Sequence, residues 1–101
     1  MTITVLALST GQLDTVRAIL VRRLPGIEVR VFGSRARGDA RVLSDLDLLL
    51  LPPEPLSALE RFFLRDEFSE SDLPFRVDIV DGAATSSEFL RSIASDSAPL
   101  E

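Results

Sequence analysis

Two short stretches decide the fold of this chain: GSRARG at residues 33–38 and SDLDL at residues 44–48. The first follows residues 27–32, which alternate apolar and polar side chains as a half-buried strand does. The second opens residues 46–51, a nearly unbroken apolar run that is typical of a strand buried on both faces. The sequence therefore predicts a strand, a tight glycine turn and a second strand that begins with acidic residues.

The acidic pair Asp45 and Asp47, at the start of the second strand, has the chemistry of a metal site. Residues two apart in a strand point to one face and lie about 6.5–7 Å apart along the chain. Two carboxylates placed this way can share Mg²⁺, which prefers few carboxylates together with water and phosphate oxygens. Two such ions about 4 Å apart stabilise the attacking and leaving oxygens of an in-line displacement. We therefore predict that Asp45 and Asp47 bind one or two divalent ions.

The glycine turn between the two strands suits a polyphosphate. Gly33 lets the backbone approach a ligand without a Cβ atom, and Ser34 can donate its hydroxyl to a phosphate oxygen. Arg35 and Arg37 supply planar guanidinium donors for phosphate. Because residues 34–37 are enough for one helical turn, the first N–H groups of that turn also suit an anion. We predict that these four residues bind the phosphates of a nucleotide.

A third carboxylate lies in PFRVDIVDG, residues 74–82, which predict another short strand. Asp78 has apolar neighbours there, and a carboxylate in such a strand is unusual unless it is paired or metal-bound. If this strand lies beside residues 46–51, Asp78 can complete the metal cluster or accept the proton of an incoming hydroxyl. Alternatively, Asp78 pairs with Arg76 on the same face or caps a neighbouring loop. Asp81 points to the opposite face and is the weaker candidate.

Three helices are predicted around these strands. The first begins at a capping box, Ser9 with Gln12, and keeps helical spacing as far as Pro25. The second covers about 55–68, and a short third covers about 87–94. Four apolar side chains of the second segment are expected to face the core: Leu56, Leu59, Phe62 and Phe63.

The chain is expected to form one domain over residues 1–101, because it is too short for a second core. The order of the elements predicts a two-layer or three-layer α/β domain with a small sheet. Residues 1–8 are expected to be an arm, an extra strand or a partner contact. Residues 95–101 are expected to be a frayed tail.

The composition narrows the function. There is no cysteine and no histidine, so a metal must take oxygen ligands, which favours Mg²⁺ or Mn²⁺. A net charge of −5 argues against direct nucleic-acid binding and against a template-directed polymerase. No apolar stretch is long enough to cross a membrane and the N-terminus lacks the basic region of a secretory signal, so we expect a cytoplasmic protein. Four arginines can still form a local positive patch near the glycine turn: Arg30, Arg35, Arg37 and Arg41.

Taken together, the motifs resemble those of the polymerase β nucleotidyltransferase superfamily, and more closely its minimal nucleotidyltransferase (MNT) branch. The pattern of that family is GS, ten residues and DxD, followed later by a VDhVD strand in which h is apolar; residues 33–34, 45–47 and 77–81 match it. The resemblance covers about residues 13–100. It implies an α+β fold of the polymerase β-like type, with a small mixed sheet, helices packed on one side and the active site on the open side.

The resemblance also implies a mechanism. The three aspartates would bind Mg²⁺ or Mn²⁺ as catalytic residues, and Asp78 would help to deprotonate an acceptor hydroxyl. Gly33 and Ser34, with Arg35 or Arg37, would bind the β and γ phosphates of ATP. The acceptor would then attack the α phosphorus and pyrophosphate would leave, with catalysis coming mainly from positioning and charge stabilisation.

The acceptor is implied by the family's usual companion, an all-helical HEPN protein that is often a toxin ribonuclease. A member of the MNT family would act as the antitoxin and transfer AMP to a tyrosine hydroxyl of that toxin. Two alternatives remain open. One is a transferase with a small-molecule acceptor, and the other is a nucleotide-binding module that neutralises its partner by contact alone.

Overall fold

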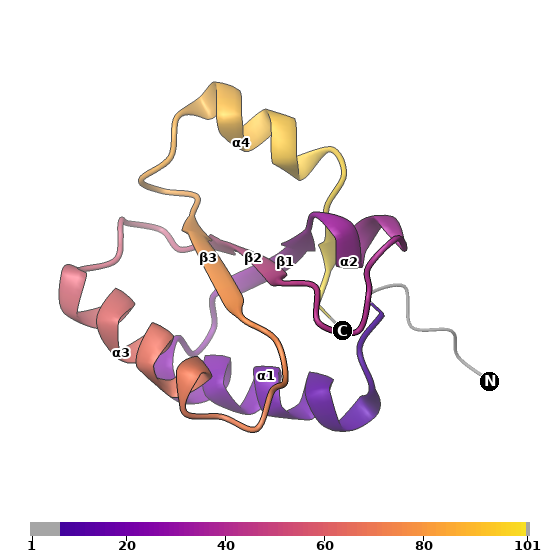
Figure 1. Ribbon diagram of the computed structural model, residues 1–101. Helices are drawn as coiled ribbons and strands as arrows, with labels where there is room; N and C mark the ends of the chain where they lie inside the picture. The colour runs from indigo at the N-terminus through magenta and orange to yellow at the C-terminus, as the bar shows by residue number, and fades with distance from the viewer. Residues whose placement is uncertain (1–6, 101) are drawn as a thin grey trace.

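The fold is that of a small α+β domain, and the computed structural model describes residues 7–100 of it (Figure 1). Most of the arm expected at residues 1–8 therefore lies outside the described residues, as does residue 101. The elements follow in the order α1 (Thr10–Arg23), β1 (Glu28–Phe32), α2 (Ser34–Arg37), β2 (Leu46–Leu51), α3 (Ala58–Ser69), β3 (Val77–Asp81), α4 (Ser87–Ala94) and β4 (Ala98–Pro99). Among the described residues, no helix has the length and apolar character needed to cross a bilayer.

The four strands form one mixed sheet in the order β3-β2-β1-β4. β1 is antiparallel to both β2 and β4, whereas β2 and β3 are parallel. In this register Asp47 lies opposite Phe32 of β1 and beside Asp78 of β3. The mixed sheet expected from the family resemblance is confirmed, and β2 and β3 present acidic residues at the same end of the sheet.

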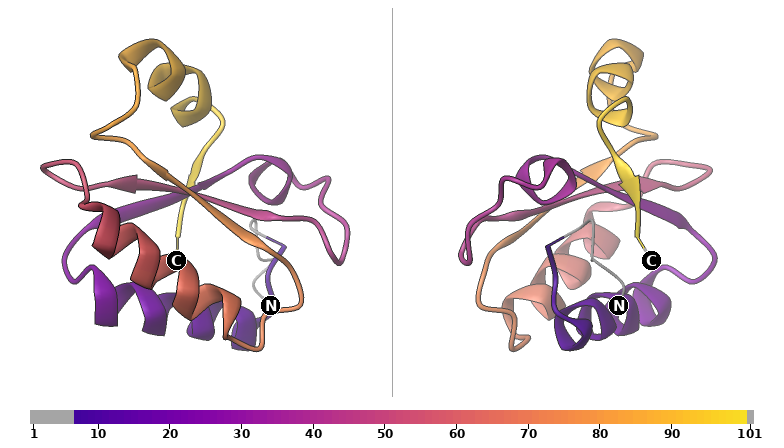
Figure 2. Two further views of the ribbon diagram at one scale, coloured as in Figure 1. Left: turned by 60° about the vertical axis from the view of Figure 1, so that its left-hand side comes forward. Right: turned by 90° about the vertical axis from the view of Figure 1, so that its right-hand side faces the viewer.

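α1 and α3 lie side by side beneath the sheet, and α4 lies over its other face (Figure 2). The core between the sheet and these two helices is made of apolar side chains from α1, α3 and the sheet: Val16, Ile19, Leu20, Val31, Leu46, Leu48, Leu50, Leu64 and Phe68. Leu49 is also fully buried but points to the face that α4 covers, since neighbouring strand residues alternate between faces. β2 is thus buried on both faces, as its apolar run predicts.

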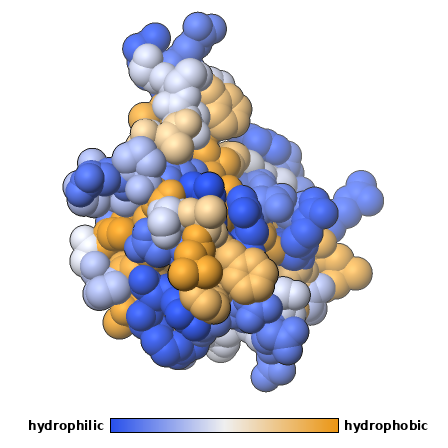
Figure 3. All heavy atoms as spheres, turned by 90° about the vertical axis from the view of Figure 1, so that its left-hand side faces the viewer, coloured by the Kyte–Doolittle hydropathy of each residue, from blue (hydrophilic) through white to orange (hydrophobic). Residues whose placement is uncertain are grey.

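The prediction that the three apolar residues Leu59, Phe62 and Phe63 face the core is wrong. They are 61%, 59% and 38% exposed, and apolar side chains lie among charged ones on the face shown in Figure 3. The core contacts of α3 come from Leu64 and Phe68, which lie four residues apart. Because a helix turns about 100° per residue, the side chains just before Leu64 point away from the sheet. Leu56, just before α3, is buried as predicted.

The expected frayed tail is also wrong for the described residues up to 100. Ala98 and Pro99 form β4 against β1, and the Leu100 N–H donates to the Val29 carbonyl at 3.3 Å. Arg30 of β1 fastens the turn before β4, because its Nε donates to Ser97 Oγ at 2.6 Å and its Nη2 to the Ser97 carbonyl at 3.2 Å. The chain thus returns from α4 to the free edge of β1.

Candidate active site

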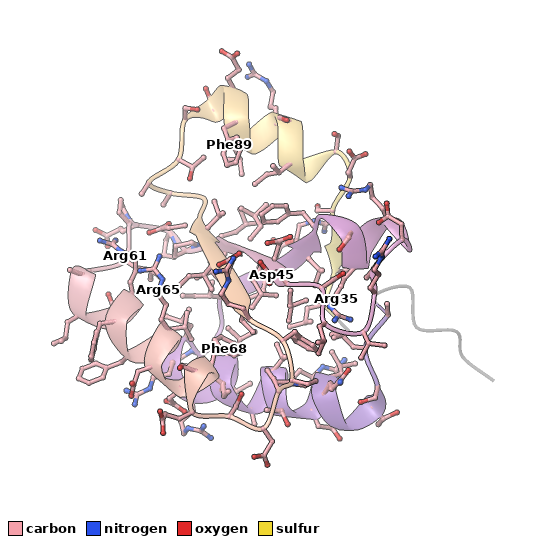
Figure 4. All side chains as sticks on the ribbon, in the orientation of Figure 1. Arg35, Asp45, Arg61, Arg65, Phe68 and Phe89 are labelled. Atoms are coloured by element: carbon pink, nitrogen blue, oxygen red, sulfur yellow. The ribbon has the colours of Figure 1, made fainter. Side chains whose placement is uncertain are left out.

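Asp47 and Asp78 lie at one end of the two parallel strands, and Asp45, which is labelled in Figure 4, lies just before β2 at the same end. Asp47 and Asp78 are register partners on β2 and β3, and neighbouring strands lie about 4.8 Å apart. Asp45 lies just before β2, two residues from Asp47, and therefore points to the same side. The structure thus brings together the three carboxylates that sequence analysis selected, on the face opposite the α1–α3 layer.

Gly33 lies directly against Asp47. A Cβ atom placed on Gly33 would lie 2.3 Å from Asp47 Oδ2, which is far inside van der Waals contact. The backbone of Gly33 also has φ 76° and ψ −157°, a conformation that is essentially restricted to glycine. Both facts require glycine here, and they explain how the turn after β1 approaches the carboxylates so closely.

α2 follows Gly33 as a single helical turn that carries Ser34 and Arg37. The turn ends at Gly38, whose left-handed conformation lets its N–H donate to the Ser34 carbonyl at 3.0 Å. Arg37 is half-exposed, with its Nε 3.7 Å from Asp39, and its positive charge is close enough to Asp47 to lower the pKa of that carboxyl. Ser34 and Arg37 therefore lie at the mouth of the site, where a bound anion could meet them.

Arg35 has a different role from the phosphate contact expected from the sequence. Its side chain is only 3% exposed and is directed into the protein (Figure 4). The guanidinium donates to the carbonyls of Ser44 at 2.9 Å, Val42 at 3.1 Å and Ala7 at 2.7 Å, and it stacks 4.1 Å above the Phe75 ring. Arg35 thus holds the loop that leads to Asp45, and we exclude it from the residues that contact phosphate.

The surroundings of Asp47 disfavour the charged form of its carboxyl. Burial raises the pKa of its carboxyl, and the negative charges of Asp78 and Asp45 raise that pKa further. The positive charges of Arg37 and Arg76 oppose this shift. A carboxylate in this setting is favoured by any additional cation, so the electrostatics of the site suit a divalent ion.

Arg76 bridges two of the carboxylates. Its Nη2 donates to Asp45 Oδ2 at 2.8 Å, and its Nε lies 3.6 Å from Asp78 Oδ1. The hydrogen bond with Asp45 and the charges of Asp45 and Asp78 raise the pKa of the guanidinium. The pairing with Asp78 follows from the two-residue spacing in the sequence. The stronger contact with Asp45 has no local sequence signal, because it joins positions 31 residues apart.

A divalent ion fits the chemistry of this site. The donors are carboxylate oxygens, which Mg²⁺ and Mn²⁺ prefer, and the absence of a side chain on Gly33 lets the turn after β1 lie against Asp47. Within residues 7–100, no three acidic side chains converge closely enough to coordinate one ion. The contacts of Arg76 hold Asp45 and Asp78 on its guanidinium instead.

Asp81 lies on the other face of β3, as predicted, and is buried. Its Oδ2 accepts the Leu56 N–H at 2.7 Å and its Oδ1 accepts the Ala83 N–H at 2.9 Å. These bonds fix the segment before α3 and the turn after β3. Asp81 is therefore a structural residue and not a metal ligand.

Asp81→Asn is expected to lower the free energy of unfolding by about 1–2 kcal/mol, because one buried N–H loses its charged acceptor. Affinity for ATP should not change, since the residue points away from the site. Urea unfolding and nucleotide titration measure the two quantities. Asp14→Asn, an exposed change on α1, is the control for the lost charge. Unchanged stability of Asp81→Asn would contradict the structural role.

Comparison with known proteins identifies the family of the chain. The family model of the nucleotidyltransferase domain matches residues 13–100. Over 84 residues the chain is 46% identical to the probable protein adenylyltransferase MntA of Haemophilus influenzae. The aligned residues cover 83% of this chain and 74% of that protein. The chain therefore belongs to the nucleotidyltransferase family, in its minimal (MNT) branch.

Solved structures share the fold. A toxin–antitoxin structure with AMP-PNP has a TM-score of 0.75 at 23% identity, over 88% of this chain and 72% of that one. The structure of the tri-AMPylated HEPN toxin of Shewanella oneidensis in complex with an MNT antitoxin has a TM-score of 0.68 at 22% identity. The match covers 88% of this chain and 68% of that one. The structure of a candidate minimal nucleotidyltransferase has a TM-score of 0.67 at 33% identity, and the match covers 88% of this chain and 89% of that one. These likenesses confirm the fold class predicted from the sequence.

Proposed function

We propose that this nucleotidyltransferase is a metal-dependent antitoxin that transfers AMP from ATP to a tyrosine hydroxyl of a partner HEPN toxin. The observation that carries the proposal is the register of Asp47 beside Asp78, with Gly33 directly against Asp47. The names of similar proteins support a HEPN toxin as the acceptor, whereas the choice of tyrosine comes from the family resemblance. One relative is a protein adenylyltransferase, and one structural neighbour is an antitoxin bound to an AMPylated HEPN toxin.

The nucleotide-binding part of the site is the turn after β1. The Gly33 backbone, the Ser34 hydroxyl and the half-exposed Arg37 guanidinium bind the β and γ phosphates. Asp45, Asp47 and Asp78 would hold Mg²⁺ or Mn²⁺, which neutralises charge on the phosphates and on the leaving pyrophosphate. ATP is abundant in the cytoplasm, where we expect the protein to act.

The acceptor reaches the site from the β3 side. β3 is an edge strand of the sheet, and the Asp78 side chain is 47% exposed. A groove of about 420 Å³ opens beside Asp78, with Phe68, Leu73 and Phe75 among its lining residues. Asp78 accepts the proton of the acceptor hydroxyl, the hydroxyl oxygen attacks the α phosphorus, and the bond from that phosphorus to pyrophosphate breaks.

Removal of divalent metal is expected to abolish the modification. The chain is co-expressed with the protein encoded next to it, whatever its fold, the pair is incubated with ATP and Mg²⁺ or with EDTA, and the neighbour is weighed by intact mass spectrometry. A gain of one or more AMP units that EDTA prevents is the expected result, and tryptic mapping should place AMP on tyrosine.

Other results would contradict the proposal in different ways. A stable complex without a change in mass would favour neutralisation by contact alone. Absence of any complex, together with labelling of a soluble compound, would favour a small-molecule acceptor. AMP transfer that persists in EDTA would contradict the metal requirement.

A further inference from the structure

We propose that Arg76 is the counter-ion of the metal-free carboxylates, and that it releases Asp45 when a divalent ion binds. The inference rests on the proposed function, because it concerns the same three aspartates. Arg76 Nη2 donates to Asp45 Oδ2 at 2.8 Å, and its Nε lies 3.6 Å from Asp78 Oδ1. One guanidinium thus takes up oxygens that a metal ion would need.

The backbone fixes Arg76 at this place. The Leu46 N–H, between Asp45 and Asp47 in sequence, donates to the Arg76 carbonyl at 2.9 Å. The main chain of Arg76 is therefore tied to the start of β2, and its Cα stays next to the carboxylates. The side chain is 73% exposed. It can swing into solvent without disturbing the core, so release of Asp45 needs no change in the fold.

The charges of the site explain why such a cation is needed. Three carboxylates at one sheet end repel one another, and burial makes the charge of Asp47 costlier still. The positive charges of two arginines, Arg37 and Arg76, act on Asp47. Among the residues that the structure describes, Arg37 forms its ion pair with Asp39 and not with one of the three site aspartates. Arg76 is the one that contacts Asp45 and Asp78 directly. A divalent ion and Arg76 therefore stabilise the same carboxylates and compete for them.

Replacing Arg76 should consequently tighten metal binding. Arg76→Gln keeps a polar but shorter side chain and removes the charge. Removing one unit charge at a distance of roughly 7 Å from a divalent ion is expected to tighten binding about three- to tenfold. The measurement is titration of the full chain with Mn²⁺, without nucleotide, with free Mn²⁺ followed by electron paramagnetic resonance.

Two further variants serve as controls. Arg76→Lys keeps the charge and should bind Mn²⁺ with an affinity close to that of the wild type. Arg65→Gln removes a charge from the same groove, but within residues 7–100 Arg65 makes no ion pair with the three aspartates. Arg65→Gln should therefore change the affinity for Mn²⁺ clearly less than Arg76→Gln does. Raising the salt concentration should shrink the difference between Arg76→Gln and the wild type.

The outcomes separate this inference from the proposed function. Equal or weaker Mn²⁺ binding by Arg76→Gln, in a chain that still transfers AMP, would overturn the inference alone. Tighter binding by Arg76→Gln, together with a wild type that transfers no AMP, would support the inference and overturn the function. If neither the wild type nor Arg76→Gln bound Mn²⁺, the inference would be wrong, and the EDTA experiment would still decide the proposed function.

Discussion

Asp47→Asn is expected to reduce AMP transfer by at least about a thousandfold, because charge stabilisation by a bound metal is worth several kcal/mol and each 1.36 kcal/mol is tenfold in rate. Asp47 is the central ligand of the proposed site. It follows Asp45 by two residues in the sequence, and it lies beside Asp78 of the neighbouring strand. An amide is neutral and a poorer ligand for Mg²⁺. The measurement is the rate at which the partner protein gains AMP, followed by intact mass.

The same variant should be at least as stable as the wild type. Burial and neighbouring carboxylates raise the pKa of Asp47 in the folded protein, so the folded state disfavours its charge. Such a group contributes stability below the unfolded pKa, about 3.9, and this contribution is lost as the pH rises through the folded pKa. Asp47→Asn removes that penalty at pH 7, and the advantage should vanish below the unfolded pKa.

Urea unfolding at pH 7 and at a pH below the unfolded pKa tests whether Asp47→Asn stabilises the protein only at the higher pH. Asp14→Asn, on the exposed side of α1, is the control. A variant that loses both activity and stability at pH 7 would mean that Asp47 supports the fold. A variant that retains transfer would remove Asp47 from the catalytic site.

Gly33→Ala is expected to have the second largest effect. The added Cβ would meet Asp47 Oδ2 at 2.3 Å, so the carboxylate must move away from its position in the site. The backbone conformation of Gly33 adds strain of about 1–3 kcal/mol for any other residue. In a domain of this size, each kcal/mol lowers the melting temperature by about 4–8 °C. Both AMP transfer and the melting temperature should therefore fall.

The control adds the same methyl group elsewhere. Gly11 lies in the first turn of α1 and has nothing within 4 Å of its added Cβ. Gly11→Ala should raise stability slightly, since alanine is favoured over glycine in helices. If Gly33→Ala matched Gly11→Ala in melting temperature and in transfer rate, the close approach of Gly33 to Asp47 would have no consequence.

The parts of the site that sequence reasoning predicts well are those that depend on local periodicity. Asp45 and Asp47 share a side because strand residues alternate, and Asp78 and Asp81 are separated for the same reason. The position of Asp78 beside Asp47 required one further assumption, that β3 is the neighbour of β2. The structure supports it.

The misplaced residues depend on contacts between distant segments. The guanidinium donors of Arg35 suit a phosphate and a set of loop carbonyls equally well. Only the fold shows that the carbonyls are the acceptors within reach of Arg35. Phe62 is apolar, but the phase of α3 is set by Leu64 and Phe68 against the sheet. β4 has no sequence signal of its own, since its two residues are held by the edge of β1.

The burial of Arg35 has a consequence for how the domain opens. One guanidinium joins Ala7, before α1, to the α2 turn and to the loop of residues 41–44. Local opening of any of these segments leaves buried hydrogen-bond donors unpaired, which penalises partial unfolding. The start of the described chain, the phosphate turn and the approach to Asp45 therefore belong to one cooperative unit, whose amide protons should exchange together.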